Sequence, residues 1–389
     1  MDALRNTIQP YAWGSLTALA ELAGRPVPSR GPEAELWMGA HPLAPSRITD
    51  GGGERSLLDL IAAQPEAVLG ARVLGRFGPR LPFLLKVLAA ETPLSLQAHP
   101  NLEQARAGYA AEEAQGVPLD AAHRNYKDPN HKPELICALG PFHALVGFRE
   151  PQATARLFAR LALAKLEPFL AFLKAGDLRG FFQGVMTSPP ALRAELAAVT
   201  QRGCLAISGG EFAEEYAWAA RVGELYPGDV GIVIALCLNL LTLAPGQAVY
   251  LPAGNLHAYL QGTGVEIMAS SDNVLRGGLT PKHVDVTELL SVLDFSAIDA
   301  RPLEAERDGD EHVFRTPAPE FRLSYFDVEG TLRPQRSDGP EILLVTRGSA
   351  LLSAGVDLQL AQGGSALIRA SDPGYALSGS ARVFRATAA

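Results

Sequence analysis

Several residue types are scarce in this chain, and each scarcity excludes a class of protein. Only three cysteines occur in 389 residues, and Cys137, Cys204 and Cys237 are widely spaced in apolar surroundings. This spacing excludes a disulfide framework and a thiolate metal site, and predicts buried free thiols. The longest apolar run, "VGIVIALCL" from Val230, is well short of the roughly 20 residues that span a bilayer. No membrane association is therefore expected.

Positive charge is also scarce. The net charge is −8 and no run of Lys and Arg stands out, which argues against a nucleic-acid-binding surface. An anionic substrate would therefore need a local basic cluster. The first residues, "MDALRNTIQP", lack the apolar core of a secretory signal, so a cytoplasmic protein is expected.

The length and the local patterns predict more than one domain. A chain of 389 residues is too long for one ordinary core. Residues 1–148 are rich in Pro, Gly and short apolar runs, which indicates β-structure with short helices at 56–70 and 101–114. Residues 151–222 are rich in Ala, Leu and Arg at helical spacing, and the run 229–241 also looks helical. Short strands and turns follow to the end.

A repeat occurs in the second β-rich region. "LAPGQAVYLPAG" at 243–254 aligns with "LAQGGSALIRAS" at 360–371, with matching Leu, Ala and Gly positions. Two β-domains of one type are therefore plausible. The counterpart of His257 in the second copy is Gly374, so that copy lacks whatever this histidine does.

The stretch "LSLQAHP" places polar residues at alternate positions. On a strand, Ser95, Gln97 and His99 would share one face, and Pro100 would end the strand. "GQAVYLPAGNLH", which ends at His257, resembles the second motif of the cupins, small β-barrels that hold a metal ion. "QAH" resembles the first cupin motif with one histidine replaced by glutamine.

The third ligand of a cupin site is a carboxylate. Glu103 is one candidate, and Glu134 is the better one because it opens an apolar, strand-like run after a polar loop. With Gln97, His99 and His257 it gives an oxygen and nitrogen donor set that suits zinc, and also Mn, Fe or Co. Apart from His131, the other histidines are interpreted as structural. They are His41, His123, His143, His283 and His312.

The segment 264–285 is polar after its first residues. Such a loop is usually only solvated, but acids beside an Arg and a Lys are also what acid/base chemistry on an anion requires. The residues concerned are Glu266, Asp272, Asn273, Arg276 and Lys282.

Six ordered stretches together resemble type I mannose-6-phosphate isomerase, the phosphomannose isomerase family. They are "QPYAWGS", "ELWMGAHP", "PFLLKVLAAETPLSLQAHP", "YKDPNHKPE", "YLPAGNLHAYL" and "GVEIMASSDNVLRGGLTPKHVD". The resemblance implies one zinc ion per chain with Gln97, His99, Glu134 and His257 as ligands. It also implies catalytic Arg276, Lys132 and Glu266. Implied substrate-binding residues are Trp13, Lys86, Ser95, Lys282, Asp272 and His131, with Lys86, Ser95 and Lys282 on the phosphate.

The resemblance further implies a mainly β fold with an α-helical insert. A cupin-type jelly-roll barrel that binds the metal would comprise residues 1–148 and 228–305. Residues 149–227 would form the helical domain, and 306–389 a degenerate cupin-like barrel. A monomer acting on a small sugar phosphate is expected, without nucleic acid or membrane partners.

The family reaction interconverts mannose 6-phosphate and fructose 6-phosphate. A proton is removed beside a carbonyl, and the resulting enediol(ate) would be stabilised by zinc and Arg276. Lys132 and Glu266 are both open as the proton carrier, and Asp272 or His131 could assist ring opening. Two rival hypotheses are an iron-dependent cupin oxygenase and a non-catalytic sugar-binding cupin. No Gly-rich nucleotide loop of the bifunctional isomerases is found.

Overall fold

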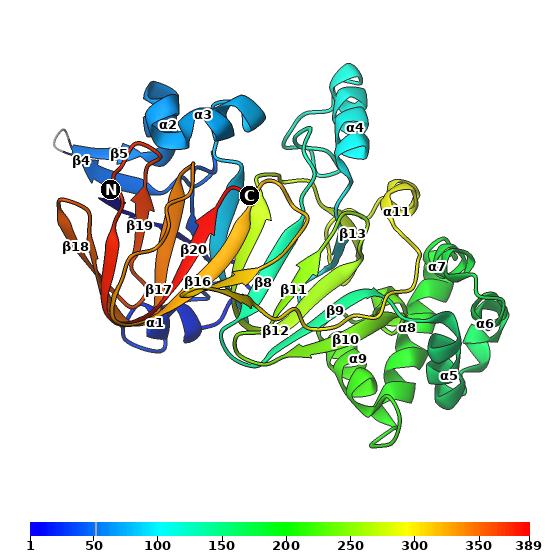
Figure 1. The fold of residues 1–389 in the computed structure, drawn as a ribbon. Helices are drawn as coiled ribbons and strands as arrows, with labels where there is room; N and C mark the ends of the chain where they lie inside the picture. Colours follow the sequence, from blue (N-terminus) through cyan, green and yellow to red (C-terminus); the bar gives the residue numbers. More distant parts are fainter. Residues whose placement is uncertain (51–52) are drawn as a thin grey trace.

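The computed structural model describes residues 1–50 and 53–389, and its fold is mainly β with helices attached (Figure 1). Two large antiparallel sheets dominate the described residues. The ten-stranded sheet, here the first sheet, comprises β2 (Thr7–Gln9), β3 (Glu35–Met38), β6 (Phe83–Ala90), β7 (Leu96–Ala98), β8 (Glu134–Ala138), β9 (Phe142–Phe148), β10 (Leu238–Leu243), β11 (Ala248–Leu251), β12 (His257–Ala269) and β13 (Leu275–Gly278).

The eight-stranded sheet, here the second sheet, is formed mostly by the C-terminal part of the chain (Figure 1). It comprises β1 (Asp2–Ala3), β14 (Glu306–Asp308), β15 (Glu311–Phe314), β16 (Arg322–Leu332), β17 (Glu341–Ser353), β18 (Asp357–Ala361), β19 (Ser365–Ile368) and β20 (Ala376–Thr387). Strands β4 (Arg47–Asp50) and β5 (Gly53–Ser56) pair only with each other.

Strand β1 brings the N-terminus of the chain next to its C-terminal part. β1 pairs with β19, and the Met1 ammonium lies 2.9 Å from the Asp372 carboxylate. The first residues therefore belong to the second sheet, whereas the sequence analysis grouped them with the metal-binding domain.

Strand β12 organises the first sheet. Its second half pairs with β6 and β8, and its first half pairs with β9 and β7. The change of partners falls at Gly262, which has φ 134° and whose added Cβ would lie 2.6 Å from the Phe142 ring. Only glycine fits this backbone conformation and this close approach. One continuous strand can therefore carry His257 and Glu266 into two parts of the same site.

The segment rich in Ala, Leu and Arg is helical, as predicted. It contains α5 (Pro151–Leu161), the 3₁₀ helix η1 (Ala164–Leu166), α6 (Glu167–Lys174), α7 (Leu178–Met186), α8 (Pro190–Leu205) and α9 (Ala213–Leu225). These helices lie together beside β9 and β10 (Figure 1) and share a core with Leu145, Phe148 and Leu260 of the first sheet. The other helices are α1 (Ala18–Leu22), α2 (Leu57–Ala63), α3 (Pro65–Phe77), α4 (Leu102–Ala114), α10 (Gly231–Ala235) and α11 (Val286–Val292).

The helical prediction for 229–241 is wrong in its second half. Helix α10 ends at Ala235, and β10 begins at Leu238 and pairs with β9 along its length. An apolar run of this kind fits a buried helix or a buried strand, and the long-range pairing decided between them.

The two copies of the repeat have the same local structure. β11 and β19 occupy equivalent positions, and each follows a turn with a left-handed glycine, Gly246 or Gly363. The turns close with equivalent backbone hydrogen bonds, from Gln247 N to Ala244 O (3.0 Å) and from Gly364 N to Ala361 O (2.8 Å). The sequence similarity therefore reflects a shared strand, turn and strand unit.

A shared apolar core joins the two sheets. Val87 and Ile267 of the first sheet and Leu344 and Phe384 of the second belong to one cluster of fully buried side chains. All three cysteines are buried free thiols, as predicted. Among the described residues, no helix combines the length and the apolar character needed to cross a bilayer.

Candidate metal centre and active site

Three strands bring two histidines and a carboxylate together. His99 follows β7, Glu134 begins β8 and His257 begins β12. Strand β12 pairs at its start with β7, through His257 and Gln97, and near its end with β8, through Met268 and Glu134. The His99 carbonyl also accepts a hydrogen bond from Gly254 N (2.8 Å), which holds the turn before His257 in place. One possible ligand atom from each of the three residues lies within 4.8 Å of the others.

The hydrogen bonds of the histidines direct their free nitrogens toward Glu134. His99 Nδ1 lies 2.7 Å from the Asn273 carbonyl oxygen, and His257 Nδ1 lies 3.0 Å from the Asn255 carbonyl oxygen. A carbonyl only accepts, so each Nδ1 carries the proton and each Nε2 presents a lone pair. Both Nε2 atoms are buried without a hydrogen-bond partner among the described residues.

The Glu134 carboxylate completes the cluster. Its Oε1 lies 3.5 Å from His99 Nε2, and its Oε2 lies 3.4 Å from His257 Nε2. Two ligands bound at about 2.0–2.1 Å to a tetrahedral ion lie about 3.4 Å apart. Glu134 Oε2 also has no hydrogen-bond partner. Three buried acceptor atoms that face one another at this spacing fit a divalent cation. Without a cation, these buried polar atoms would stay unpaired, which is costly.

The surroundings hold these groups in the protonation states that bind metal. Burial, and then the nearby Lys132 ammonium, lower the pKa of His99 to about 4, so its imidazole is neutral at pH 7. Burial raises the pKa of Glu134, but Lys132 and the two histidines outweigh it and hold the pKa well below the ordinary value. The Lys132 ammonium lies 2.8 Å from Glu134 Oε1.

Gln97 lies next to this cluster in the middle of β7. Its Cα is paired with that of His257 on one side and with that of Arg276 in β13 on the other. The side chain is only partly buried, unlike those of His99, Glu134 and His257. Gln97 therefore stands between the buried cluster and Arg276.

A second group of buried charges lies further along β12. The Lys86 ammonium lies 3.6 Å from Glu35 Oε1 and 3.5 Å from Glu266 Oε2. Burial alone would lower the pKa of Lys86, but the two carboxylates raise it above the ordinary value. Burial raises the pKa of Glu266; Lys86 opposes this, while the charges of Glu134 and Glu35 add to it. Glu266 Oε1 also accepts a hydrogen bond from the Tyr259 hydroxyl at 2.9 Å.

Asp272 and His41 form a pair at a more exposed position. His41 Nε2 lies 3.2 Å from Asp272 Oδ1, and the Asp272 side chain is 41% exposed. Burial opposes ionisation of Asp272, but the bond to His41 and the charges of His41, Lys132 and Lys86 lower its pKa. Tyr11 is close as well, since burial and the charges of Glu35 and Asp272 raise the pKa of its hydroxyl. Trp13 stacks on Tyr11 with ring centroids 5.7 Å apart.

The residues predicted to contact the phosphate lie in two different parts of the site. Burial, followed by the charges of Arg276 and Lys127, lowers the pKa of Lys282, so both of these cations lie near Lys282. Within residues 1–50 and 53–389 none of them has a carboxylate partner at ion-pair distance. Ser95 directly precedes β7, the neighbour of the strand that carries Arg276. Lys86, in contrast, lies between two carboxylates, so its charge is already neutralised.

His131 points toward another region. Its Nε2 lies 2.7 Å from Glu320 Oε1, in the loop that precedes β16 of the second sheet. The charged groups of the His99, Glu134 and His257 cluster, Lys132, Lys86, Glu266 and Asp272 therefore lie close enough to shift one another's pKa values, whereas His131 pairs with a different partner.

Four neighbours of the site were not among the candidates from the sequence. They are Glu35, Tyr259, Tyr11 and Lys127. The sequence held one signal for Glu35, because this residue lies two positions before Trp37 on β3. In the structure, Trp37 Nε1 donates a hydrogen bond to Glu35 Oε2 at 2.6 Å. The position of Glu35 diagonal to Lys86, which is paired with Trp37, depends on pairing between β3 and β6, which a single sequence does not reveal.

Comparisons with known proteins agree with this geometry. A profile of the family described as "Phosphomannose isomerase type I, catalytic domain" matches residues 1–151. The mannose-6-phosphate isomerase of Escherichia coli strain K12 is 41% identical over 391 residues, which is 99% of each chain. This chain belongs to the type I phosphomannose isomerase family.

Solved structures of the family superpose over the whole chain. The crystal structure of a K86A mutant of phosphomannose isomerase from Salmonella typhimurium gives a TM-score of 0.93 at 40% identity, covering 100% of this chain and 99% of that one. A zinc-bound crystal structure of a mannose 6-phosphate isomerase gives a TM-score of 0.91 at 40% identity with the same coverage. The family resemblance inferred from six sequence stretches is therefore confirmed.

Proposed function

We propose that this chain is a zinc-dependent aldose–ketose isomerase that interconverts mannose 6-phosphate and fructose 6-phosphate. The observation that carries the proposal is the convergence of three buried, unpartnered acceptor atoms from His99, Glu134 and His257. Their spacing fits a tetrahedral zinc ion, and Gln97 on the adjacent strand is proposed as the fourth ligand. The related proteins named above carry this activity in their names.

When bound, zinc supplies a Lewis acid that lowers the energy of negative charge on the sugar oxygens. The chain supplies the other requirements. Arg276 lies beside Gln97 on the neighbouring strand, and burial lowers the pKa of its guanidinium without changing its charge at pH 7. We assign Arg276 to stabilise the negative charge of the enediolate oxygen.

The phosphate is held by cations that lack carboxylate partners. Lys282, Arg276 and Lys127 repel one another, and a phosphate group between them would relieve that repulsion. Ser95 is proposed to contribute its hydroxyl. Binding energy from the remote phosphate positions the reacting carbons, and Trp13 with Tyr11 would cover the sugar. Lys86 is proposed to orient Glu266 inside the site.

The two candidate proton carriers differ in their surroundings. The Lys132 ammonium is already paired with the Glu134 carboxylate at 2.8 Å. Glu266 is buried and has a raised pKa, which makes its carboxylate a stronger base near neutral pH. We therefore favour Glu266 as the base that takes the proton at C2 and returns it at C1, with Lys132 as an electrostatic partner.

Ring opening of the cyclic sugar needs a separate proton carrier. Asp272, with His41 behind it, is the better placed of the two candidates, because its carboxylate is partly exposed and lies near Lys132 and Lys86. His131 is engaged with Glu320 and stays a weaker candidate. The monomeric state and the cytoplasmic location expected from the sequence stay predictions.

The division into domains is also proposed. Residues 4–148 and 228–305 would form a cupin-type jelly-roll barrel around the metal, and 149–227 a helical domain. Residues 306–389 with β1 would form a second, degenerate barrel. The equivalent turns at Gly246 and Gly363 support a common origin of the two barrels, and Gly374 at the position of His257 supports loss of the metal in the second.

An isomerase assay with controlled metal content tests the function. Mannose 6-phosphate should be converted to fructose 6-phosphate by the zinc-loaded protein, not by chelated protein, and again after zinc is restored. Full turnover by metal-free protein would overturn the proposal. Oxygen consumption without isomerisation would favour an iron oxygenase instead.

A further inference from the structure

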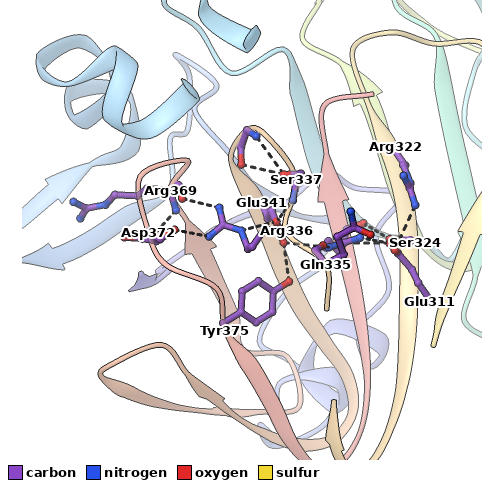
Figure 2. Close-up of polar contacts among 12 residues, drawn as sticks. Glu311, Arg322, Ser324, Gln335, Arg336, Ser337, Glu341, Arg369, Asp372 and Tyr375 are labelled. Carbon is purple, nitrogen blue, oxygen red and sulfur yellow. Dashed lines mark hydrogen bonds and ion pairs between the residues drawn. The ribbon is translucent and has the colours of Figure 1, made fainter. Parts of the chain in front are cut away.

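Carboxylates outside the metal cluster differ in whether the chain occupies both of their oxygens. In the second sheet, Glu341 accepts from Arg336 Nε at 2.9 Å and from the Tyr375 hydroxyl at 2.7 Å, one bond to each oxygen (Figure 2). The pair of His41 and Asp272 is different, because only one oxygen of Asp272 is engaged. The other oxygen is available to a ligand.

The hydrogen bonds of His41 determine what it offers to Asp272. Leu43 N donates to His41 Nδ1 at 3.3 Å, so Nδ1 presents a lone pair. The single proton of the imidazole therefore lies on Nε2. Nε2 lies 3.2 Å from Asp272 Oδ1 and donates to it. His41 is thus a hydrogen-bond donor to this carboxylate.

The His41 side chain is itself held in place. It is 5% exposed, and its ring meets that of Trp37 edge to face with centroids 4.8 Å apart. Ala44 N donates to the His41 carbonyl at 3.1 Å and closes the turn that follows β3. A buried ring on a fixed backbone has little freedom to change rotamer, so the position of its Nε2 is well defined.

The backbone of Asp272 is held by other groups. Asp272 N donates to Asp128 Oδ2 at 2.7 Å, and the Ser271 hydroxyl donates to the same oxygen at 3.1 Å. On the other side, the Asn273 carbonyl accepts from His99 Nδ1 at 2.7 Å. The main chain at position 272 is therefore fixed next to the metal cluster without any contact of its own side chain.

The Asp272 side chain, in contrast, is held by His41. Within residues 1–50 and 53–389, Oδ1 bonds only to His41, and Oδ2 has no hydrogen bond or ion pair. The side chain is 41% exposed, so a ligand can reach the carboxylate. Lys132 and Lys86 are near enough to lower its pKa, which agrees with a position beside the metal cluster. Without the bond from His41, Oδ2 could rotate away.

Opening of a cyclic sugar requires a carboxylate or similar group with a defined direction. The bond between the anomeric carbon and the ring oxygen breaks, a carbonyl forms, and one proton moves from the anomeric hydroxyl to the ring oxygen. A carboxylate can accept the proton from the hydroxyl and return it to the ring oxygen, so no other reactant is consumed. Its oxygen must lie within hydrogen-bond reach of both sugar oxygens.

We propose that His41 is a positioning residue for ring opening, because its Nε2–H holds Asp272 Oδ1 so that Oδ2 faces the anomeric and ring oxygens of the sugar. This inference rests on the function proposed above, with Asp272 as the proton carrier for ring opening. It gives a histidine that the sequence pattern indicated to be structural a part in the reaction.

A substrate without a ring separates ring opening from isomerisation. 5-Deoxyfructose 6-phosphate lacks the hydroxyl that closes the fructose ring, so it is open in solution. His41→Phe keeps a ring against Trp37 but removes the N–H donor. For the zinc-loaded variant, kcat should fall about 10- to 100-fold with fructose 6-phosphate and less than about twofold with the open-chain substrate.

Two further variants make the test specific. His41→Gln can place an amide N–H near the position of Nε2, and should stay within about threefold of the wild type on fructose 6-phosphate. His312→Phe is the matched control, because His312 also stacks on an aromatic ring, that of Tyr325 at 4.6 Å, but lies in the second sheet. It should change turnover of either substrate by less than about twofold.

The outcomes distinguish this inference from the proposed function. A wild type that isomerises neither substrate would refute the function. With an active wild type, an equal loss with both substrates in His41→Phe, or no loss with either, would overturn the role of His41. So would a further loss when His41→Phe is added to Asp272→Asn, because a positioning residue acts only through the group that it holds.

Zinc content and turnover of the open-chain substrate report the integrity of each variant. His41→Asn, whose shorter amide does not reach Asp272, gives the same comparison if His41→Phe does not retain zinc.

Discussion

Each of the two sheets buries a cluster of charges, and the clusters differ in how their polar atoms are satisfied. In the first sheet, His99 Nε2, Glu134 Oε2 and His257 Nε2 are buried acceptor atoms that no donor in the described part of the chain reaches. In the second, Glu341 accepts from Arg336, Ser337 and Tyr375 and has no unpartnered side-chain oxygen. Buried polar groups cost free energy unless they are paired. The first cluster is therefore built for an ion from outside, and the second is completed by the chain itself.

The largest expected effect is the loss of bound metal and activity from variants of the first cluster. Glu134→Ala and His257→Ala should each lose bound zinc and lower kcat/KM by more than about 100-fold, since even the loss of an outer partner costs 10–100-fold. Metal analysis and the isomerase assay measure both effects. His143→Ala is the control, because the side chain of this histidine contacts Thr242 and Trp218 and not the cluster. Retained zinc with lost activity would show that the cluster is not the metal centre.

Breaking the second cluster should affect stability instead. Arg385→Ala leaves the buried Glu311 without its main partner and removes a 3.5 Å contact to Glu341, and should lower the free energy of unfolding by about 3–5 kcal/mol. Zinc content and kcat should persist below the unfolding transition. Arg382→Ala on the same strand removes a more exposed pair with Asp327 and should cost less than about 1 kcal/mol. Equal effects of the two variants would contradict the comparison.

The first sheet should also make the metal-free protein sensitive to acid. In the unfolded chain His99 titrates near pH 6.5, whereas in the fold its pKa is about 4. The unfolded state therefore binds more protons between these values, and stability should fall by about 3 kcal/mol as the pH falls from 6.5 to 4. Glu134, whose pKa is also lowered, acts in the same direction at lower pH. Denaturation midpoints against pH measure this, and His99→Gln should flatten the upper part of the curve.

The smallest effect concerns the link between the two sheets. The pair His131 and Glu320 is partly exposed, so Glu320→Gln should change stability by less than about 1 kcal/mol and leave kcat within about threefold. A double-mutant cycle with His131→Gln measures the coupling. A large loss of kcat in His131→Gln alone would assign this histidine to ring opening rather than to the link.

Local sequence patterns were sufficient to predict part of the fold and part of the candidate site. The helical insertion followed from Ala and Leu spacing, and Gln97, His99 and His257 were predicted as metal ligands from motifs that are short in sequence; of these, His99 and His257 lie together with Glu134. The error at 229–241 arose because an apolar run fits either secondary structure until a partner strand selects one. Glu35 and Lys127 were missed because their contacts with Lys86 and Lys282 join segments that are distant in the chain.

The sequence by itself determined the family, the donor types of the metal site and the loss of the histidine from the second repeat. These are properties of residue identity and local spacing. Only the tertiary structure decided that Lys86 is neutralised by Glu35 and Glu266, while Lys282 and Arg276 have no carboxylate partner within residues 1–50 and 53–389. The physical reason is that charge pairing and burial depend on strand register. A single strand such as β12 delivers His257 and Glu266 to different neighbours only because Gly262 lets it change partners.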